Sequence, residues 1–131
     1  RHFLPHFIQE HYRDGIYEGS LRACTMFADL SGFTRLTDKL MQRGPEGAEE
    51  LSDVLNHIFQ PTVALVYAQG AFIPYFAGDS FTAIFPIHDS AEAPLIARKV
   101  LQTAQAMLSR FEHEQADPNS ILSEHHIGLK V

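Results

Sequence analysis

The segment from Leu21 to Thr37 constrains the fold of this chain more than any other. Its first part, 21–28, is apolar on both alternating faces, which is typical of a strand in the middle of a sheet. Asp29 follows, then a turn containing Gly32, and then apolar residues at helical spacing, namely Phe33, Leu36, Leu40 and Met41. We therefore expect a central strand that ends on a carboxylate and leads through a glycine turn directly into a helix.

The middle of the chain predicts a second, longer helix and then a hairpin. One apolar face runs along 47–70, and because Pro61 lies inside it we expect a kink or a restart there. Two short runs rich in aromatic residues, 72–77 and 81–85, flank Gly78-Asp79-Ser80 and predict paired strands. Pro74 within the first run indicates an edge strand or a distortion.

The last part of the chain predicts another helix and another strand. Ser90 is the expected cap of that helix, and Asp117-Pro118-Asn119 ends it. The expected core stripe consists of Ala97, Val100, Leu101, Ala104, Met107, Leu108 and Phe111. Residues 126–131 predict the first half of a strand. The order strand, helix in two pieces, strand, strand, helix, strand is that of an α+β, ferredoxin-like (split βαβ) fold, incomplete at its C-terminal end.

The composition sets limits on the size of the domain and on the kinds of partner that it can have. The chain has 131 residues, 45% of them hydrophobic, which suffices for one core in 21–131, preceded by a helix at 3–12 and a linker within 1–20. Its net charge of −6 and lack of a basic run argue against nucleic acid or an anionic membrane as the main partner. The single Cys24 fits a reducing, cytoplasmic location, and no apolar stretch approaches the roughly 20 residues of a membrane span.

Two aspartates are expected to meet at one rim of this sheet. In the split βαβ order the first strand lies antiparallel to the third, so its end lies beside the start of the third, and Asp29 approaches Asp79. Adjacent strands are about 4.8 Å apart, so the two carboxylates would repel unless a cation such as Mg²⁺ lay between them. An Asp before a Ser-Gly turn is also a common helix cap, and Gly-Asp is common in hairpin turns. Residue types alone leave both interpretations open.

The turn after Asp29 is suited to an anion. Ser31, Gly32, Phe33 and Thr34 stand at the start of a predicted helix, where free backbone N–H groups and the helix dipole attract negative charge. A triphosphate held there could share a metal ion with the two carboxylates.

Two motifs resemble the catalytic domains of class III nucleotidyl cyclases. MFADLSGFT (26–34) is similar to that family's metal-binding strand, and YFAGDSFTAIFP (75–86) is similar to its second metal-binding hairpin. The helix and strand between them match the family in spacing and type, so the resemblance spans 21–131. The helix at 3–12 and the AGD form of the hairpin favour the branch similar to soluble adenylyl cyclase.

The resemblance implies a role for each residue of the two motifs. Asp29, Asp79 and the Leu30 carbonyl would bind two Mg²⁺ (or Mn²⁺) ions, and the backbone of Ser31 to Thr34 would hold the β- and γ-phosphates of ATP rather than GTP. The ribose 3′-hydroxyl would then attack the α-phosphate and release cyclic AMP and pyrophosphate.

One position departs from the family. Tyr75 stands where the family has a lysine that reads the purine, and the family's other base-reading and transition-state residues belong to a segment beyond Val131. We therefore expect the metal-bearing half of a site that a second cyclase half completes, on the same chain or a homologous one. The 131 residues alone are expected to be inactive.

Other interpretations remain. A catalytically degenerate cyclase-like domain, with a nucleotide-binding, regulatory or dimerisation role, is the main alternative. A diguanylate cyclase fits less well, because 77–81 lacks that family's glycine pair and acidic fourth residue. Eight histidines form no cluster with zinc spacing, so we expect surface positions for most. The aromatic residues in the hairpin are expected in the core or at a dimer interface, namely Phe72, Tyr75, Phe76 and Phe81.

Overall fold

The computed structural model describes residues 6–131, and the part of the expected N-terminal helix at residues 3–5 lies outside them. The elements in chain order are α1 (His6–Arg13), β1 (Ala23–Ser31), α2 (Phe33–Met41), α3 (Pro45–Ala68), β2 (Phe76–Ala77), β3 (Ser80–Pro86), the 3₁₀ turn η1 (Ser90–Glu92), α4 (Ala93–Ala116) and β4 (Gly128–Lys130). This order confirms the α+β, split βαβ pattern expected from the sequence.

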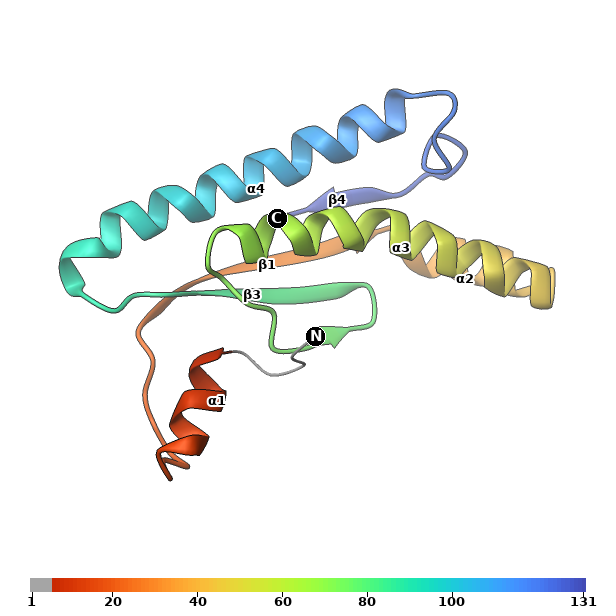
Figure 1. Ribbon diagram of the computed structural model, residues 1–131. Helices are drawn as coiled ribbons and strands as arrows, with labels where there is room; N and C mark the ends of the chain where they lie inside the picture. Colours follow the sequence, from red (N-terminus) through yellow and green to blue (C-terminus); the bar gives the residue numbers. More distant parts are fainter. Residues whose placement is uncertain (1–5) are drawn as a thin grey trace.

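The four strands form one antiparallel sheet in the order β2-β3-β1-β4. β1 therefore lies in the interior of the described sheet, between β3 and β4, as its apolar sequence predicted (Figure 1). Its register with β3 pairs Met26 with Ala83 and Asp29 with Ser80. The expected antiparallel pairing of the first and third strands is confirmed.

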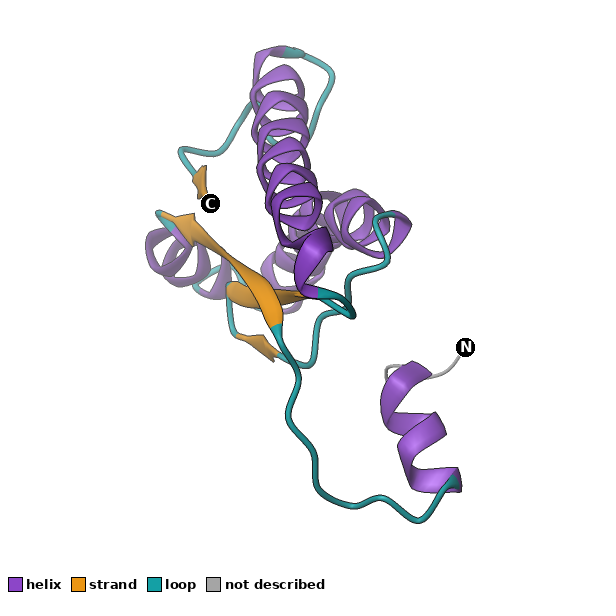
Figure 2. Cartoon of the chain, turned by 90° about the vertical axis from the view of Figure 1, so that its left-hand side faces the viewer, coloured by secondary structure: helices purple, strands orange, loops and turns teal. Residues whose placement is uncertain are grey.

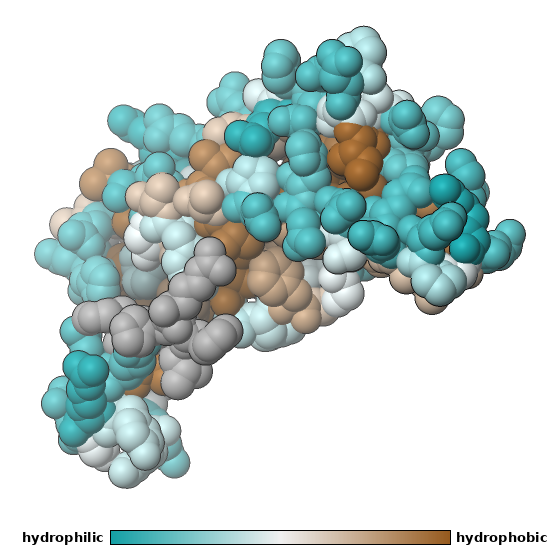
Figure 3. Space-filling model, turned by 45° about the vertical axis from the view of Figure 1, so that its right-hand side comes forward, coloured by the Kyte–Doolittle hydropathy of each residue, from teal (hydrophilic) through white to brown (hydrophobic). Residues whose placement is uncertain are grey.

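One face of the sheet carries the core. Alternate residues of β1 point to it, and because Met26, Ala28 and Leu30 are all at most 4% exposed, the intervening Phe27 and Asp29 lie on the opposite, open face. On the core side, Met107 of α4 and Val66 of α3 pack against the strands. Figure 2 shows the helices of the body gathered along the sheet, and in the view of Figure 3 hydrophilic side chains cover much of their outer surface.

A close contact fixes the corner between α2 and α3. A Cβ built at Gly47 would lie 1.7 Å from the carbonyl oxygen of Leu40, which is fully buried. No side chain fits there without moving backbone atoms, so the glycine lets α3 pack tightly on α2. This corner holds α2, and with it the turn at Gly32, against the second part of the core, where Leu36, Leu40 and Val54 are buried together.

Two expectations about local structure need correction. α3 runs without interruption through Pro61, so the expected restart does not occur there, and the alternative, a kink, stays a prediction. Packing of the buried face holds the helix together although proline lacks an N–H. The predicted strand 72–77 is reduced to Phe76–Ala77, with Phe72 forming one isolated bridge to Ile84, because Pro74 cannot continue the ladder.

The cap and the core stripe of α4 also differ from the prediction. The N-cap of α4 is Glu92, not Ser90, and it forms no side-chain capping bond. Asp89 caps the preceding 3₁₀ turn η1: its side chain accepts a bond from the N–H of Ala91, and Glu92 accepts one from the N–H of Asp89. Ser90 instead accepts a hydrogen bond from Arg22. Ala97 and Leu101 are exposed, Leu101 to 71%, and the fully buried positions are Thr103, Met107 and Phe111.

The N-terminal helix stands apart from this body. Figures 1 and 2 both show α1 joined to β1 by an extended segment, 14–22, that places the helix to one side of the sheet. Tyr12 and Tyr17 pack edge to face with ring centroids 5.9 Å apart and close the turn that follows α1. Within residues 6–131 the structure contains no helix with the length and apolar character needed to cross a membrane.

Candidate active site at the β1–α2 turn

The end of β1 and the β2–β3 hairpin lie side by side. The N–H of Leu30 donates a hydrogen bond to the carbonyl oxygen of Asp79 at 3.2 Å, and Asp29 lies opposite Ser80. The hairpin turn consists of Gly78 and Asp79, with φ of +64° at Gly78 as a type II′ turn requires. The sheet therefore brings the backbones of Asp29 and Asp79 together at one rim, as the topology predicted.

Both aspartate side chains are half-buried and have no partner. Neither carboxylate forms a hydrogen bond or an ion pair with any side chain or backbone group of residues 6–131. Asp29 does not cap a helix, because the N-cap of α2 is Gly32 and no side chain forms a capping bond at that end of the helix. Likewise the hydroxyl of Ser80, not the carboxylate of Asp79, bonds across the hairpin turn, to the Ala77 carbonyl at 3.0 Å. Neither local structural role explains these two acids.

The turn between β1 and α2 is built on Gly32. Its φ of +83° favours glycine, and a Cβ there would lie 2.6 Å from the carbonyl oxygen of His126. Beside it the hydroxyl of Ser31 donates to the Gly128 carbonyl at 3.3 Å, which ties the turn to β4. Phe33 and Thr34 are the first two residues of α2, so their backbone N–H groups have no partner within the helix. The turn thus offers free N–H groups at the positive end of a helix.

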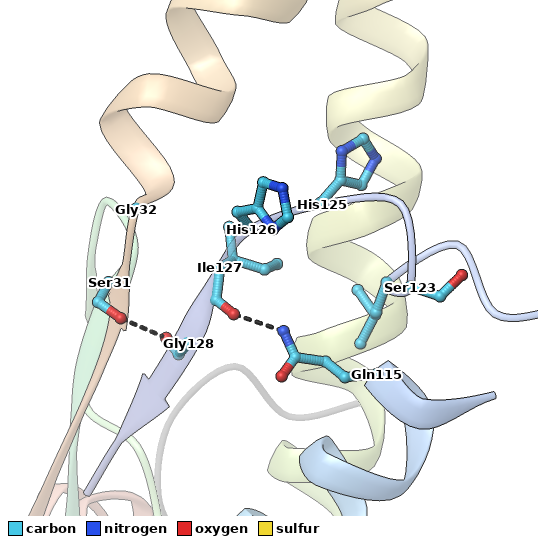
Figure 4. A pocket seen from close by; sticks show the side chains of 9 residues that line it. Ser31, Gly32, Gln115, Ser123, His125, His126, Ile127 and Gly128 are labelled. Carbon is cyan, nitrogen blue, oxygen red and sulfur yellow. Dashed lines mark hydrogen bonds between the residues drawn. The ribbon is translucent and has the colours of Figure 1, made fainter. Parts of the chain in front are cut away.

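A cavity of about 540 Å³ lies on the β4 side of this turn. Ser31 and Gly32 line it together with residues that the sequence reading did not select, namely Gln115, Leu122, Ser123, His125, His126, Ile127 and Gly128. Figure 4 shows Ser31 and Gly32 on one side and Gln115 and Ser123 on the other, with Gln115 bonded to the Ile127 carbonyl. Asp29, Asp79, Phe33 and Thr34 do not line the cavity. The segment 120–128 carries no motif, so only the fold could assign it.

His125 is the most buried titratable side chain in this wall. It is 7% exposed, and its Nε2 atom lies 3.5 Å from a carboxylate oxygen of Glu50 on α3, without hydrogen-bond geometry. The other oxygen of Glu50 accepts a bond from Arg43. These contacts tie the segment before β4 to the α2–α3 corner.

A second polar junction lies away from the turn. His57 of α3 bonds to Glu114 of α4 at 2.9 Å, and the Ser120 hydroxyl donates to the same carboxylate at 3.1 Å. The hydrogen bond from His57 is the largest of the effects that hold the pKa of Glu114 below its ordinary value, and burial acts in the opposite direction.

The aromatic residues of the hairpin divide between core and surface. Phe81 is 1% exposed and packs edge to face on Phe59 with ring centroids 6.0 Å apart. Phe76, 5.5 Å from the same ring, closes the edge of that cluster. Tyr75, at the position of the family's purine-reading lysine, is 65% exposed, and Phe27 on the open face is 58% exposed. Phe81 therefore belongs to the core, and the open face keeps exposed aromatic surface.

The residues described fit oxygen-ligated cations better than a transition metal. Within residues 6–131 no three His, Cys, Asp or Glu side chains gather as a metal cluster. The rim at β1 instead offers two carboxylates and one backbone carbonyl, that of Leu30, which are the hard oxygen ligands that Mg²⁺ takes when a phosphate or water supplies the others.

Comparisons with known proteins agree with this fold. No model of a protein family matches the chain. Over 88 residues it is 34% identical to adenylate cyclase type 10 of Homo sapiens, and over 97 residues it is 32% identical to that of Mus musculus. The matches cover 66% and 70% of this chain but 5% and 6% of the relatives, so the chain spans a small part of the length of the curated proteins it resembles.

The solved structures extend the match over 97% of the chain. A bacterial light-regulated adenylyl cyclase has the same fold, with a TM-score of 0.66 and 19% identity, over 97% of this chain and 36% of that one. The fold and the sequence together define a class III nucleotidyl cyclase domain, which confirms the resemblance read from the two aspartate motifs. Among the curated relatives, the matches are to adenylate cyclase type 10, which agrees with the branch that the sequence favoured.

Proposed function

We propose that this chain is the metal-bearing part of an adenylyl cyclase that converts ATP to cyclic AMP and pyrophosphate. The observation that carries the proposal is the pair of partnerless carboxylates, Asp29 and Asp79, whose backbones are joined by the Leu30–Asp79 hydrogen bond beside the Gly32 turn. A half-buried carboxylate without a partner is costly. Two of them at one rim favour a site that is completed by bound cations.

Each residue has a separate task in this proposal. Asp29, Asp79 and the Leu30 carbonyl supply metal ligands; in an extended strand the C=O and N–H of one residue point to the same side, so the Leu30 carbonyl faces the hairpin of Asp79. The N–H groups at Ser31, Gly32, Phe33 and Thr34 hold the β- and γ-phosphates at the positive end of α2. The turn therefore positions the α-phosphorus above the rim.

The reaction needs little covalent chemistry from side chains. Two Mg²⁺ or Mn²⁺ ions, when bound, would lower the pKa of the ribose 3′-hydroxyl and neutralise the triphosphate. The 3′-hydroxyl loses its proton to solvent water, its oxygen forms a bond to the α-phosphorus, the bond from the α-phosphorus to the bridging oxygen breaks, and pyrophosphate leaves. The chain contributes orientation, because the fixed turn and the fixed carboxylates define where the triphosphate lies.

A second cyclase half, from the same or a homologous chain, is proposed to cover the open face of the sheet. Phe27, exposed on that face next to Asp29, gives the face an apolar contact. The exposed Tyr75 has a neutral hydroxyl in place of the lysine ammonium, so recognition of ATP over GTP is assigned to the partner half. We also propose a cytoplasmic location, in keeping with the free thiol of Cys24.

The test uses the full-length protein with its partner half. Asp29→Asn and Asp79→Asn keep the side-chain shape but remove a charged metal ligand, and each should lower cyclic AMP formation by more than about 100-fold, because loss of outer-shell partners alone costs 10–100-fold. Asp38→Asn on the exposed side of α2 is the matched control and should leave the rate unchanged. Full activity in either rim variant would contradict the proposal.

Adding a binding measurement to this assay distinguishes the enzyme from its alternative, the catalytically degenerate domain that Tyr75 favours. Binding of Mn²⁺ with a non-cyclisable ATP analogue, lost in Asp79→Ala, combined with no product from the unaltered protein would indicate a nucleotide-binding regulator. Product formation that depends on both aspartates supports the cyclase.

A further inference from the structure

His125 is a buried histidine next to the candidate site. It is 7% exposed, although the sequence led us to expect surface positions for most histidines. It belongs to the segment 117–127 between α4 and β4, and it lines the cavity beside the Gly32 turn. Its Nε2 atom has no hydrogen-bond partner in residues 6–131. A buried polar atom without a partner is costly, so its position calls for an explanation.

A carboxylate on α3 faces this imidazole. The Nε2 atom lies 3.5 Å from one oxygen of Glu50, and the pair lacks the geometry of a hydrogen bond. The other oxygen of Glu50 accepts a bond from Arg43 at 2.5 Å, which orients the carboxylate. A neutral imidazole therefore either turns a lone pair toward Glu50 or leaves an N–H unpaired. An imidazolium donates from both nitrogens, so protonation turns this contact into an ion pair.

Glu50 is the group that decides how favourable a proton on His125 is. Within residues 6–131 it is the carboxylate that lies within 4.0 Å of an imidazole nitrogen of His125. The neighbours on the segment itself are exposed, namely Glu124 and His126. Where the segment packs against α3 and α4, the titratable groups are already bonded to each other, namely His57 and Glu114.

The second junction of the segment is closed. Glu114 accepts bonds from His57 at 2.9 Å and from Ser120 at 3.1 Å. The segment is thus fixed near residue 120, whereas the Nε2 atom of His125, near its other end, lacks a partner. The end with the open contact is the one that leads into β4.

The open contact is linked to the Gly32 turn through one residue. The carbonyl oxygen of His126 lies 2.6 Å from the position that a Cβ would take at Gly32, so the two backbones touch. Figure 4 shows His126 between His125 and Gly32. Because Arg43 holds the Glu50 carboxylate, closing the contact moves the segment, and with it the backbone beside the turn.

We propose that His125 is a positioning residue: its protonation closes the contact with Glu50, holds the His126 carbonyl against the Gly32 turn and fixes the N–H groups that bind the nucleotide phosphates. This inference rests on the proposed function, and it adds control by pH to the site assigned there. A nucleotide that binds the closed form better also favours the proton on His125, so nucleotide affinity should rise as the pH falls. Imidazole is suited to this role because it changes charge between about pH 5 and about pH 8.

The test measures the affinity of a non-cyclisable ATP analogue at saturating Mn²⁺ by equilibrium dialysis, in the full-length protein with its partner half. From about pH 8 to about pH 6 the affinity should rise by about fivefold or more. His125→Gln removes the titrating nitrogens and should abolish this rise. Glu50→Gln keeps the shape of its side chain but loses the charge, and should abolish the rise as well. Circular dichroism at both pH values checks folding, and if His125→Gln does not fold, Glu50→Gln, whose side chain is 25% exposed, decides the result.

His88→Gln is the matched control. His88 is exposed in the loop between β3 and η1, so this variant should keep the full rise on acidification. Protonation of the analogue itself is the same for every variant and cancels in the comparison. Calorimetry of analogue binding in two buffers of different ionisation enthalpy should show that His125→Gln takes up fewer protons on binding than the unaltered protein or His88→Gln. A histidine with a purely structural role would not change this proton uptake.

The outcomes separate this inference from the proposed function. Loss of the rise in His125→Gln and Glu50→Gln, but not in His88→Gln, supports the role of His125. An affinity that is equal at the two pH values, or a rise that persists in folded His125→Gln, overturns it while leaving the metal site intact, provided that Asp79→Ala still abolishes Mn²⁺-dependent binding. If Asp79→Ala binds the analogue as the unaltered protein does, it is the proposed function that fails.

Discussion

Replacing Gly32 with alanine tests whether the β1–α2 turn works as a rigid phosphate cradle. Two separate costs apply. A residue with a Cβ pays about 1–2 kcal/mol for the left-handed conformation that Gly32 adopts at φ +83°. In addition, the new Cβ would lie 2.6 Å from the His126 carbonyl oxygen, a backbone atom that cannot swing away. Overpacking of this kind costs about 1–3 kcal/mol, so Gly32→Ala should destabilise the protein by about 2–5 kcal/mol.

Gly70→Ala separates the two costs. Gly70 has a similar φ of +77°, but a Cβ there meets no atom within 4 Å. It should therefore cost only the conformational part, about 1–2 kcal/mol. Any gain from the stiffer unfolded chain, about 0.4–1 kcal/mol, applies equally to both variants and cancels in the comparison. The difference between them measures the contact with His126.

The assay is urea unfolding of both variants together with analogue binding at saturating Mn²⁺. If β1 and β4 move apart to relieve the contact, the N–H groups at 31–34 move as well, and analogue binding should weaken in Gly32→Ala but not in Gly70→Ala. Equal destabilisation by the two variants, with unchanged analogue binding in both, would refute the argument that His126 and the turn form one rigid unit.

Two further predictions concern the packing that supports the site. Gly47→Ala would ordinarily stabilise a helix by about 1 kcal/mol, but the 1.7 Å approach to the Leu40 carbonyl should reverse the sign and destabilise the protein by at least about 2 kcal/mol in urea unfolding. Ala48→Gly, at the next and exposed position, measures the propensity alone, and a stabilising Gly47→Ala would contradict the packing argument. Because His57 holds the pKa of Glu114 below its ordinary value of 4.5, this carboxylate contributes stability above that pH and loses it as the pH falls through the lowered value. The stability lost in Glu114→Gln, measured by unfolding at several pH values, should thus be full above pH 4.5 and vanish at lower pH; a loss that grows on acidification would count against this assignment.

The topology could be predicted from the sequence because its determinants are local. A strand that leads through Gly32 into a helix, and a hairpin centred on Gly78 and Asp79, each follow from turn chemistry over a few residues. Once the strand order is known, the approach of Asp29 to Asp79 follows from the antiparallel pairing. The rim of the candidate site was therefore within reach of sequence reasoning.

The errors lie where tertiary contacts override a local pattern. Leu101 has helical spacing with the core residues of α4, yet it is exposed because the sheet covers only part of that helix face. Ser90 does not cap α4, because it lies inside the 3₁₀ turn η1 that precedes the helix and that Asp89 and Glu92 cap together. Lys130 and His126 approach the site only through the register of β4, and a register between strands about 100 residues apart cannot be read from either strand alone.

The shortness of β2 limits how readily the protein can aggregate through this edge of its sheet. A long, flat edge strand with aromatic side chains would expose a row of unpaired amides on which another chain could add a strand and start aggregation. Here Phe76 and Ala77 pair with β3, Phe72 adds one isolated bridge to Ile84 of the same strand, and Pro74, which has no amide hydrogen, interrupts the ladder between them. The sheet can thus keep aromatic surface near this edge without offering a template for growth.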